Sequence, residues 1–183
     1  MNKTALAHYN NNGYKPEASA IKRLAWLWAN ALFLKSSLLP FSSLKAAILR
    51  LFGAKIGDNA VIRSGITIKY PWFLVVGNNV WIGENVWIDN LAETLIEDNV
   101  CISQGAMLLT GNHNFNTSTF DLIVAGITLE EGVWLGAQSV VCPGVTCKSH
   151  SVLAVGSVAT KTLEAYSIYQ GNPAVRVKSR AIQ

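Results

Sequence analysis

Residues 76–88 read Val76-Gly77-Asn78-Asn79-Val80-Trp81-Ile82-Gly83-Glu84-Asn85-Val86-Trp87-Ile88, in which two successive six-residue units each begin with an aliphatic residue followed by glycine. The same period extends in both directions from this stretch. Aliphatic residues recur, in trios with steps of six, at Ile56, Ile62, Ile68, Val76, Ile82, Ile88, Ile96, Ile102 and Leu108. A helix would show a period near 3.6 and an isolated strand a period of 2, so neither element explains a sustained period of six.

The trios themselves recur every twenty residues, because Ile56, Val76 and Ile96 begin successive trios. A triangular solenoid accounts for this spacing. Each six-residue unit forms one flat face of a coil, and its aliphatic side chain points inward to stack on the next coil. Glycine and asparagine between the faces accept turn conformations that other residues resist. A polar stretch interrupts the period, which then continues from Leu129 to Ala159. The sequence therefore predicts an all-β solenoid.

Two segments of different character precede the repeats. Residues 1–17 are polar and turn-like, which predicts a loose arm. Residues 18–52 carry apolar side chains at helical spacing and are broken at Pro40. They therefore predict two helices, the second over about Ser42–Leu51.

Two interpretations of these helices stay open. The ends of a repeat scaffold need covering, so the helices would cap the solenoid. Alternatively, residues 18–52 would make a peripheral membrane contact, with Trp26, Trp28 and Phe33 inserted into the surface. The uncharged run Leu24–Leu34 is far shorter than the roughly 20 residues needed to cross a bilayer, so we expect no transmembrane helix.

Composition narrows the class of protein. Half of the 183 residues are hydrophobic and 14% are charged, which excludes a disordered chain. The net charge of +4 comes without a dense Lys/Arg stripe or an aromatic-basic motif, so we expect no nucleic-acid partner. Cys101, Cys142 and Cys147 show no CxxC spacing and predict neither a disulfide framework nor a zinc site. The first twenty residues lack the apolar core of a signal peptide, so we expect a cytoplasmic protein that is either free or membrane-associated.

The interruption of the repeats is the candidate site for chemistry. It begins at Thr110, and its Gly/Asn-rich sequence contains His113. A polar loop on a regular scaffold is where catalytic residues commonly lie. An imidazole with a pKa near neutrality can remove a hydroxyl proton while the oxygen attacks a thioester. We therefore predict an acyltransferase with His113 as the general base. Candidate partners for its other ring nitrogen are Glu84, Asp89, Asp121 and a backbone carbonyl.

We accordingly divide the chain into two parts. Residues 1–52 form the arm and helical cap, and residues 53–183 form the β-helix domain. The domain carries a protruding loop over 110–128 and ends in a C-terminal tail.

Several motifs connect this chain to a known family. They are Leu49-Arg50-Leu51-Phe52-Gly53-Ala54-Lys55-Ile56-Gly57, Tyr70-Pro71-Trp72, Trp81-Ile82-Gly83-Glu84, Asp89-Asn90-Leu91, Val100-Cys101-Ile102-Ser103-Gln104-Gly105, Thr110-Gly111-Asn112-His113 and Gly171-Asn172-Pro173-Ala174. The sequence resembles the hexapeptide-repeat acyltransferases, which are left-handed parallel β-helices. Within that group it is most similar to the colanic acid biosynthesis acetyltransferases (WcaF-like), relatives of the maltose and galactoside O-acetyltransferases.

This resemblance implies a function and its parts. It implies a homotrimer, with active sites between subunits, that moves an acetyl group directly from acetyl-CoA to a sugar hydroxyl without a metal. His113 matches the family's catalytic base. Asn90 falls near the position of an asparagine that lies close to the acceptor and the developing oxyanion, although a corner asparagine can also merely form a turn. Further candidates for acceptor binding are Asp89, Asn112, Asn114 and Trp87.

The resemblance also implies a donor site along the C-terminal coils. The matching positions are Trp134, Gly136, Ala137, Ala154, Val155, Gly156, Ser157, Thr160 and Lys161. Val155 is bulkier than the glycine or alanine that relatives more often carry. Arg176, Lys178 and Arg180 would meet nucleotide phosphates or would form a solvated basic tail.

Other functions remain open on the same scaffold. A zinc carbonic anhydrase needs three clustered histidines, whereas the histidines of this chain, His8, His113 and His150, are widely separated. An antibiotic O-acetyltransferase, an amino-sugar N-acetyltransferase and a non-catalytic scaffold would share the fold. A lipid-linked exopolysaccharide precursor as acceptor would give the N-terminal helices a role near a membrane.

Overall fold

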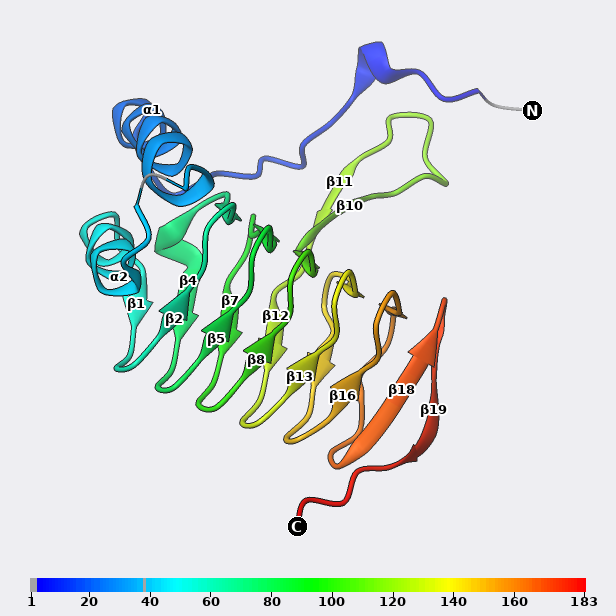
Figure 1. The fold of residues 1–183 in the computed structure, drawn as a ribbon. Coiled ribbons are helices and arrows are strands. Elements are labelled where there is room, and N and C mark those ends of the chain that lie inside the picture. The colour runs from blue at the N-terminus through cyan, green and yellow to red at the C-terminus, as the bar shows by residue number, and fades with distance from the viewer. Residues whose placement is uncertain (1–2, 38) are drawn as a thin grey trace.

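The computed structural model describes residues 3–37 and 39–183 and consists of a parallel β-solenoid with helices at its N-terminal end (Figure 1). Three parallel sheets form the faces of the prism. Sheet A contains β1 (Lys55–Ile56), β4 (Leu74–Val76), β7 (Thr94–Ile96), β12 (Ile127–Leu129) and β15 (Thr146–Cys147). Sheet B contains β2 (Val61–Ile62), β5 (Trp81–Ile82), β8 (Cys101–Ile102), β13 (Trp134–Leu135), β16 (Val152–Leu153), β18 (Ser167–Gly171) and the antiparallel β19 (Ala174–Ser179). Sheet C contains β3 (Thr67–Ile68), β6 (Trp87–Asp89), β9 (Met107–Leu109), β14 (Val140–Val141) and β17 (Val158–Ala159).

The strand register confirms the predicted repeat. Ile62, Ile82 and Ile102 are aligned partners in sheet B, and all are buried. The equivalent positions in the other sheets stack in the same way, so each inward column is a continuous line of aliphatic contacts. At the corners, Asn79 and Asn85 hold left-handed backbone conformations, as expected of asparagine in turns.

The helices begin and end close to the predicted positions, with one difference. Helix α1 spans Ala20–Ala29, and Ser19 caps its first turn by accepting a hydrogen bond from the Lys22 N–H. It continues as a π-helix, η2, over Asn30–Lys35, which apolar periodicity alone does not reveal. Helix α2 spans Ser42–Leu51, as predicted. Short 3₁₀ turns lie at Leu6–His8 (η1) and Pro71–Phe73 (η3). Among the described residues, no helix is long and apolar enough to cross a membrane.

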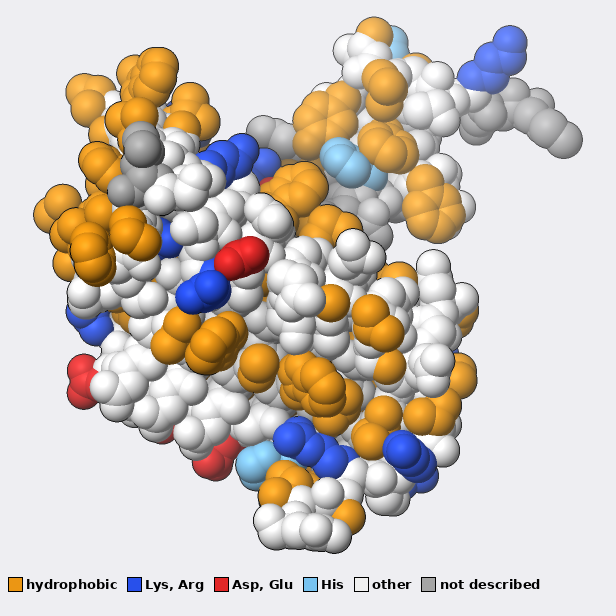
Figure 2. Space-filling view, in the orientation of Figure 1, with side chains coloured by type: hydrophobic (Ala, Val, Ile, Leu, Met, Phe, Trp, Pro, Cys, Tyr) orange, Lys and Arg blue, Asp and Glu red, His pale blue; other side chains and the backbone are white. Residues whose placement is uncertain are grey.

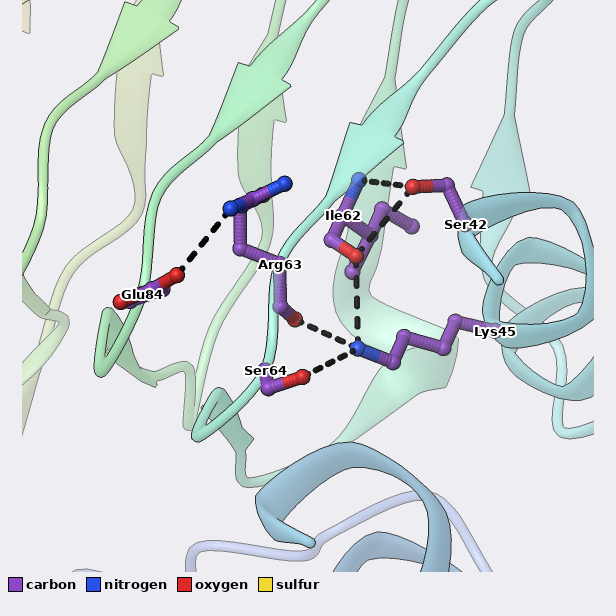
Figure 3. A network of polar contacts seen from close by, with 6 residues as sticks. All are labelled: Ser42, Lys45, Ile62, Arg63, Ser64 and Glu84. Atoms are coloured by element: carbon purple, nitrogen blue, oxygen red, sulfur yellow. Dashed lines mark hydrogen bonds and ion pairs between the residues drawn. The ribbon is translucent and has the colours of Figure 1, made fainter. Parts of the chain in front are cut away.

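Helix α2 supplies polar groups to the open edge of the first coil (Figure 3). The buried Lys45 ammonium donates to the carbonyls of Ile62 at 3.4 Å and Arg63 at 2.8 Å. The Ser42 hydroxyl accepts from the Ile62 N–H at 3.0 Å and also lies within hydrogen-bonding distance of the Ile62 carbonyl. A terminal coil has no neighbouring strand to satisfy these backbone groups, so the side chains of α2 take that role.

Residues of α1 and η2 complete this closure at the next strand. The Trp26 indole donates to the Ile68 carbonyl at 2.9 Å, and the Asn30 side chain accepts from the Ile68 N–H at 3.3 Å. Trp26 is buried against Phe52. The expectation that Trp26 would insert into a membrane is therefore wrong, whereas Trp28 and Phe33 are exposed.

The prediction of a loose N-terminal arm is also wrong for the described part of residues 1–17. The arm lies along the loop that carries His113. The Ala5 N–H donates to the Ser118 carbonyl, and the Leu122 N–H donates to the Asn10 carbonyl. These are contacts between segments more than a hundred residues apart, so local sequence gives no indication of them.

Candidate active site

The interruption of the repeat forms a β-hairpin that projects from one corner of the prism (Figure 1). Strands β10 (Gly111–His113) and β11 (Leu122–Val124) pair in antiparallel register, with His113 opposite Leu122. The hairpin leaves the solenoid after sheet C and re-enters it at sheet A. The predicted loop is therefore a defined two-stranded element with its base fixed in the third coil.

Thr110 fixes the base of this hairpin and was not among the predicted site residues. It is buried, and its hydroxyl accepts from the N–H of Leu91 at 2.7 Å and of Ala92 at 3.1 Å. The same hydroxyl donates to the Asp89 carbonyl at 3.0 Å. Its position as the last residue before the period breaks is the signal in the sequence that could have identified it.

The hairpin also orients the imidazole of His113. The ring stacks on Phe120, with centroids 4.4 Å apart and planes 11° apart. Its Nδ1 lies 3.1 Å from the Phe120 carbonyl oxygen. A carbonyl can only accept a hydrogen bond, so Nδ1 carries the proton and Nε2 of the neutral ring keeps its lone pair. Of the partners considered, the backbone carbonyl is the one that the structure provides. The arm contributes Tyr9, whose ring centroid lies 5.7 Å from that of His113.

Asn90 lies at the corner below the hairpin, where its side chain is bonded to the preceding coil. Its side chain is fully buried, and both ends of its amide bond the backbone of Tyr70 in the preceding coil. The oxygen accepts from the Tyr70 N–H at 3.0 Å, and the nitrogen donates to the Tyr70 carbonyl at 2.7 Å. The expected role in binding an oxyanion is not supported by this geometry. The amide joins two coils at the corner below the hairpin.

We predict that Asn90→Ala lowers stability and leaves catalysis nearly intact. The substitution removes the hydrogen-bond partners of the part-buried Tyr70 N–H and Tyr70 carbonyl, which costs about 1–3 kcal/mol. Urea denaturation followed by circular dichroism measures the loss, and kcat at a temperature where both proteins are folded measures the chemistry. A fall in kcat of a hundredfold without a change in stability would contradict a structural role.

The candidate acceptor residues lie in two different places. Asn112 is exposed on the hairpin and its side chain accepts from the His113 N–H, while the Asn114 side chain accepts from the Asn116 N–H. Asp89 lies at the same corner of the prism and pairs with Lys69 at 3.3 Å. Trp87 is exposed on sheet C, aligned with Thr67 and Met107.

The C-terminal coils form a groove with a volume of about 870 Å³. It runs over sheet B, and its lining includes Trp134, Ala154, Val155 and Lys178. The walls are mainly apolar, and Val155, the bulky departure from the family pattern, is 70% exposed at the rim. Its size falls within the range of pockets that hold cofactor-sized molecules.

The predicted donor residues divide between this groove and other places. Those that line it are Trp134, Gly136, Ala137, Ala154, Val155, Lys178 and Arg180. Those outside its lining are Gly156, Ser157, Thr160, Lys161 and Arg176. The guanidinium groups of Arg176 and Arg180 are already bonded within the chain, Arg176 to Ser167 and Ser179, and Arg180 to the carbonyls of Gly132 and His150.

The glycine at position 136 has a structural reason that was not foreseen. A Cβ added there would lie 2.6 Å from the backbone nitrogen of Val155, which is closer than real Cβ contacts. The next coil therefore requires the glycine, and a close approach of a ligand is not needed to explain it.

The described residues contain no candidate metal site, and the groove and the hairpin share no residue. Within residues 3–37 and 39–183, no group of three His, Cys, Asp or Glu side chains is arranged to hold a metal ion. None of the residues that line the groove belongs to the hairpin, so His113 and the groove of the same chain are separate features.

Comparison with known proteins connects this geometry to a family. No family model matches the chain. It is 37% identical over 162 residues to WcaF of Escherichia coli (strain K12), provisionally named as a colanic acid biosynthesis acetyltransferase, and the match spans 88% of this chain and 89% of that protein. It is 27% identical over 132 residues to the galactoside O-acetyltransferase of the same organism, over 70% of this chain and 65% of that one.

A solved structure shares the fold over most of the chain. The hexapeptide-repeat acetyltransferase VCA0836 of Vibrio cholerae O1 biovar eltor, complexed with acetyl coenzyme A, matches with a TM-score of 0.79 at 22% identity, over 90% of this chain and 92% of that chain. The structural match shows the fold, and the match to WcaF in sequence and coverage shows the relationship. The chain therefore belongs to the WcaF-like family of hexapeptide-repeat acetyltransferases.

Proposed function

We propose that this protein transfers an acetyl group from acetyl-CoA to a hydroxyl of a sugar or exopolysaccharide precursor, with His113 as the general base. The observation that carries the proposal is the fixed tautomer of His113. Its Nδ1 is held by the Phe120 carbonyl, so Nε2 is the nitrogen that can accept a proton. The names of the relatives, a colanic acid biosynthesis acetyltransferase and a galactoside O-acetyltransferase, support the class of donor group and acceptor.

The residues define how the proton moves. Nε2 of His113 takes the proton of the acceptor hydroxyl as that oxygen forms the new ester bond. When the carbon–sulfur bond of the thioester breaks, the imidazolium returns the proton to the departing thiolate. The Phe120 carbonyl accepts the Nδ1–H throughout this cycle and keeps the ring in one orientation.

The cysteines of the chain support direct transfer without an acyl-enzyme. A nucleophilic thiol needs a lowered pKa, because the thiolate is the reactive form. Burial instead raises the pKa of Cys147 to about 12, with the nearby Glu130 carboxylate adding to the effect. Burial also raises the pKa of Cys101 and of Cys142. These thiols are therefore poor candidates for an acyl-carrying nucleophile.

The groove on sheet B is the proposed site for the donor. Its apolar walls suit an extended pantetheine arm, and the exposed Lys178 ammonium at its lining offers a cation for phosphate. Because the hairpin lies elsewhere on the same chain, we propose that a neighbouring subunit brings its His113 over this groove in a homotrimer. The exposed aromatic rings of Trp81 and Trp134 on sheet B and Trp87 on sheet C support subunit contacts along these faces.

The first test is thiol release from acetyl-CoA against a panel of mono- and oligosaccharides, with amino sugars included. Release with hydroxyl-only sugars supports the proposal, and release with amino sugars alone favours N-acetyl transfer. Calorimetric titration with acetyl-CoA decides between an enzyme and a non-catalytic scaffold. A protein that neither binds acetyl-CoA nor releases thiol would overturn the proposed function.

We predict that Lys178→Ala raises KM for acetyl-CoA by about 3- to 10-fold and leaves kcat nearly unchanged. Loss of a contact made equally in the ground state and the transition state has this kinetic signature. Lys148→Ala is the matched control, since Lys148 pairs with Glu164 at the surface, outside the groove. Comparison with a dephospho-CoA thioester, which lacks the 3′-phosphate, then shows whether Lys178 meets that phosphate. Equal KM values for Lys178→Ala and the wild type would remove Lys178 from the donor site.

A further inference from the structure

The N-terminal helices carry a second apolar face that the solenoid does not cover. Figure 2 shows hydrophobic side chains gathered over α1 and α2. The exposed fractions are large: 82% for Ile21, 63% for Trp28 and 81% for Leu51. The other exposed members of this face are Leu24, Leu27, Leu32, Phe33, Phe41 and Leu44. We call these nine side chains the cap face.

The cap face is distinct from the side of the helices that closes the solenoid. That buried side carries Trp26, Leu34 and Leu49, which belong to the hydrophobic core. A helix with apolar residues on both sides needs a partner on both. Exposed apolar surface of this extent is unusual on a soluble monomer and marks an interaction site.

The charge around the cap face identifies the kind of partner. Residues 18–57 contain six Lys or Arg and no Asp or Glu, whereas the rest of the chain carries nine basic and eleven acidic residues. Of the six, Lys45 is buried against the first coil and Arg50 is bonded to the carbonyls of Ile56 and Gly57, which leaves four to act at the surface. An apolar helical segment that carries Lys and Arg but no carboxylate of its own matches the anionic interface of a lipid bilayer. A second cap face would be a poor partner, because like charges would meet with no acidic residue from either copy to pair with them.

A groove beside α1 adds a place for headgroup phosphates. It has a volume of about 460 Å³ and lies between α1, η2 and the first coil. Arg23 and Lys35 contribute cations to its lining, as does Lys69, which also pairs with Asp89 at 3.3 Å. Leu24 and Leu27 contribute apolar wall. A phospholipid carries its phosphate close to its acyl chains. The groove likewise places basic side chains, which can meet a phosphate, beside leucines, which can meet an acyl chain.

We propose that the cap face docks on the anionic surface of a lipid bilayer, with its apolar side chains in the interface and lipid phosphates in the groove beside α1. The docking would present the active site to acceptors at that surface. The groove reaches Tyr70, whose peptide is bonded to Asn90, and the neighbouring Leu91 N–H is bonded to Thr110 at the base of the hairpin. Helix α1 and the hairpin therefore share one corner of the prism. The presentation of the active site to acceptors rests on the proposed function, whereas docking itself does not.

Vesicle sedimentation tests the docking. The full chain should bind vesicles that contain phosphatidylglycerol in phosphatidylcholine and should bind pure phosphatidylcholine at least about tenfold more weakly, since polybasic attraction needs anionic lipid. The double variant Leu27→Ser/Trp28→Ser should lose at least about tenfold in affinity, because both side chains are mostly exposed and their loss removes inserted apolar area. Leu6→Ser/Ile182→Ser, at exposed sites away from the cap face, is the matched control and should bind like the wild type.

Charge reversal separates the groove from net charge. Lys35→Glu should weaken binding to anionic vesicles several-fold more than Lys3→Glu, although both change the net charge equally. In vesicles of brominated lipid, the wild type should lose more tryptophan emission than Trp28→Phe does. Thiol release with a soluble sugar should be the same for the wild type and Leu27→Ser/Trp28→Ser, which keeps this test independent of the chemistry.

Two results would overturn the proposal. One is equal vesicle binding by the wild type and the Leu27→Ser/Trp28→Ser variant. The other is a variant that changes oligomeric state in size-exclusion chromatography while the wild type ignores anionic vesicles, because the cap face would then be a contact between subunits.

Discussion

Replacing His113 with alanine is expected to lower kcat for acetyl transfer by about a hundredfold or more, with little change in the affinity for acetyl-CoA. At the hairpin, the Phe120 carbonyl accepts the Nδ1–H of His113, so Nε2 of the ring is free to accept a proton. Removing it takes away proton transfer in the transition state and leaves the groove on sheet B unaltered. Steady-state thiol release gives kcat, and calorimetric titration gives the affinity for acetyl-CoA.

His8→Ala provides the matched control for this variant. His8 lies on the exposed η1 turn of the arm. The substitution therefore removes the same kind of side chain at a solvated position. Its kcat should stay within about twofold of the wild type. If His113→Ala kept most of its activity, His113 would not be the base, and an acceptor that needs no base, such as an amine, would become the better interpretation.

Replacing Lys45 with methionine should destabilise the protein by about 2–3 kcal/mol, although the residue is far from the active site. The variant keeps an unbranched chain of similar length and removes the charge that caps the first coil. The carbonyls of Ile62 and Arg63 then lose their donor at the edge of the solenoid. For a chain of this size, the melting temperature should fall by roughly 5–10 °C. Urea denaturation followed by far-ultraviolet circular dichroism measures the loss directly.

The control for Lys45 is Lys55→Met, which removes the same charge from an exposed position in β1. Its stability should stay within about 0.5 kcal/mol of the wild type. The pH dependence adds a second readout. Burial, together with the nearby Arg63, lowers the pKa of Lys45, so the folded protein binds this proton less tightly than the unfolded chain. The stability of the wild type relative to Lys45→Met should therefore rise as the pH increases toward the ordinary lysine pKa of about 10.5.

The repeated part of the fold could be read from the sequence because its rule is local. Each six-residue unit places one aliphatic residue inward, so Ile62, Ile82 and Ile102 identify one another by spacing alone. The boundaries of α2 followed from Pro40 and Gly53 for the same reason. The π-helical turn at Asn30–Lys35 breaks the local period and was not predictable from it.

The candidate site was less predictable, because its geometry depends on contacts between coils. The motif identified His113 but not its partner, since the Phe120 carbonyl is a backbone group that no residue type reveals. Asn90 looked available in sequence and is buried, because Tyr70, one coil earlier, uses both ends of its amide. Gly136 was matched to the donor site, and the backbone nitrogen of Val155 in the next coil leaves no room for a Cβ at this position.

The stacking of coils has a consequence for distance. Coils between the helices and the hairpin are interchangeable units of twenty residues, and each advances the prism by one strand spacing of about 4.8 Å. The distance from the cap face to His113 can therefore change only in steps of one coil. A variant with one coil duplicated over 76–95 would lengthen that span by one step and leave both ends intact. Evolution of this scaffold can thus adjust reach in fixed increments, as a molecular ruler does, without redesigning either the helices or the catalytic hairpin.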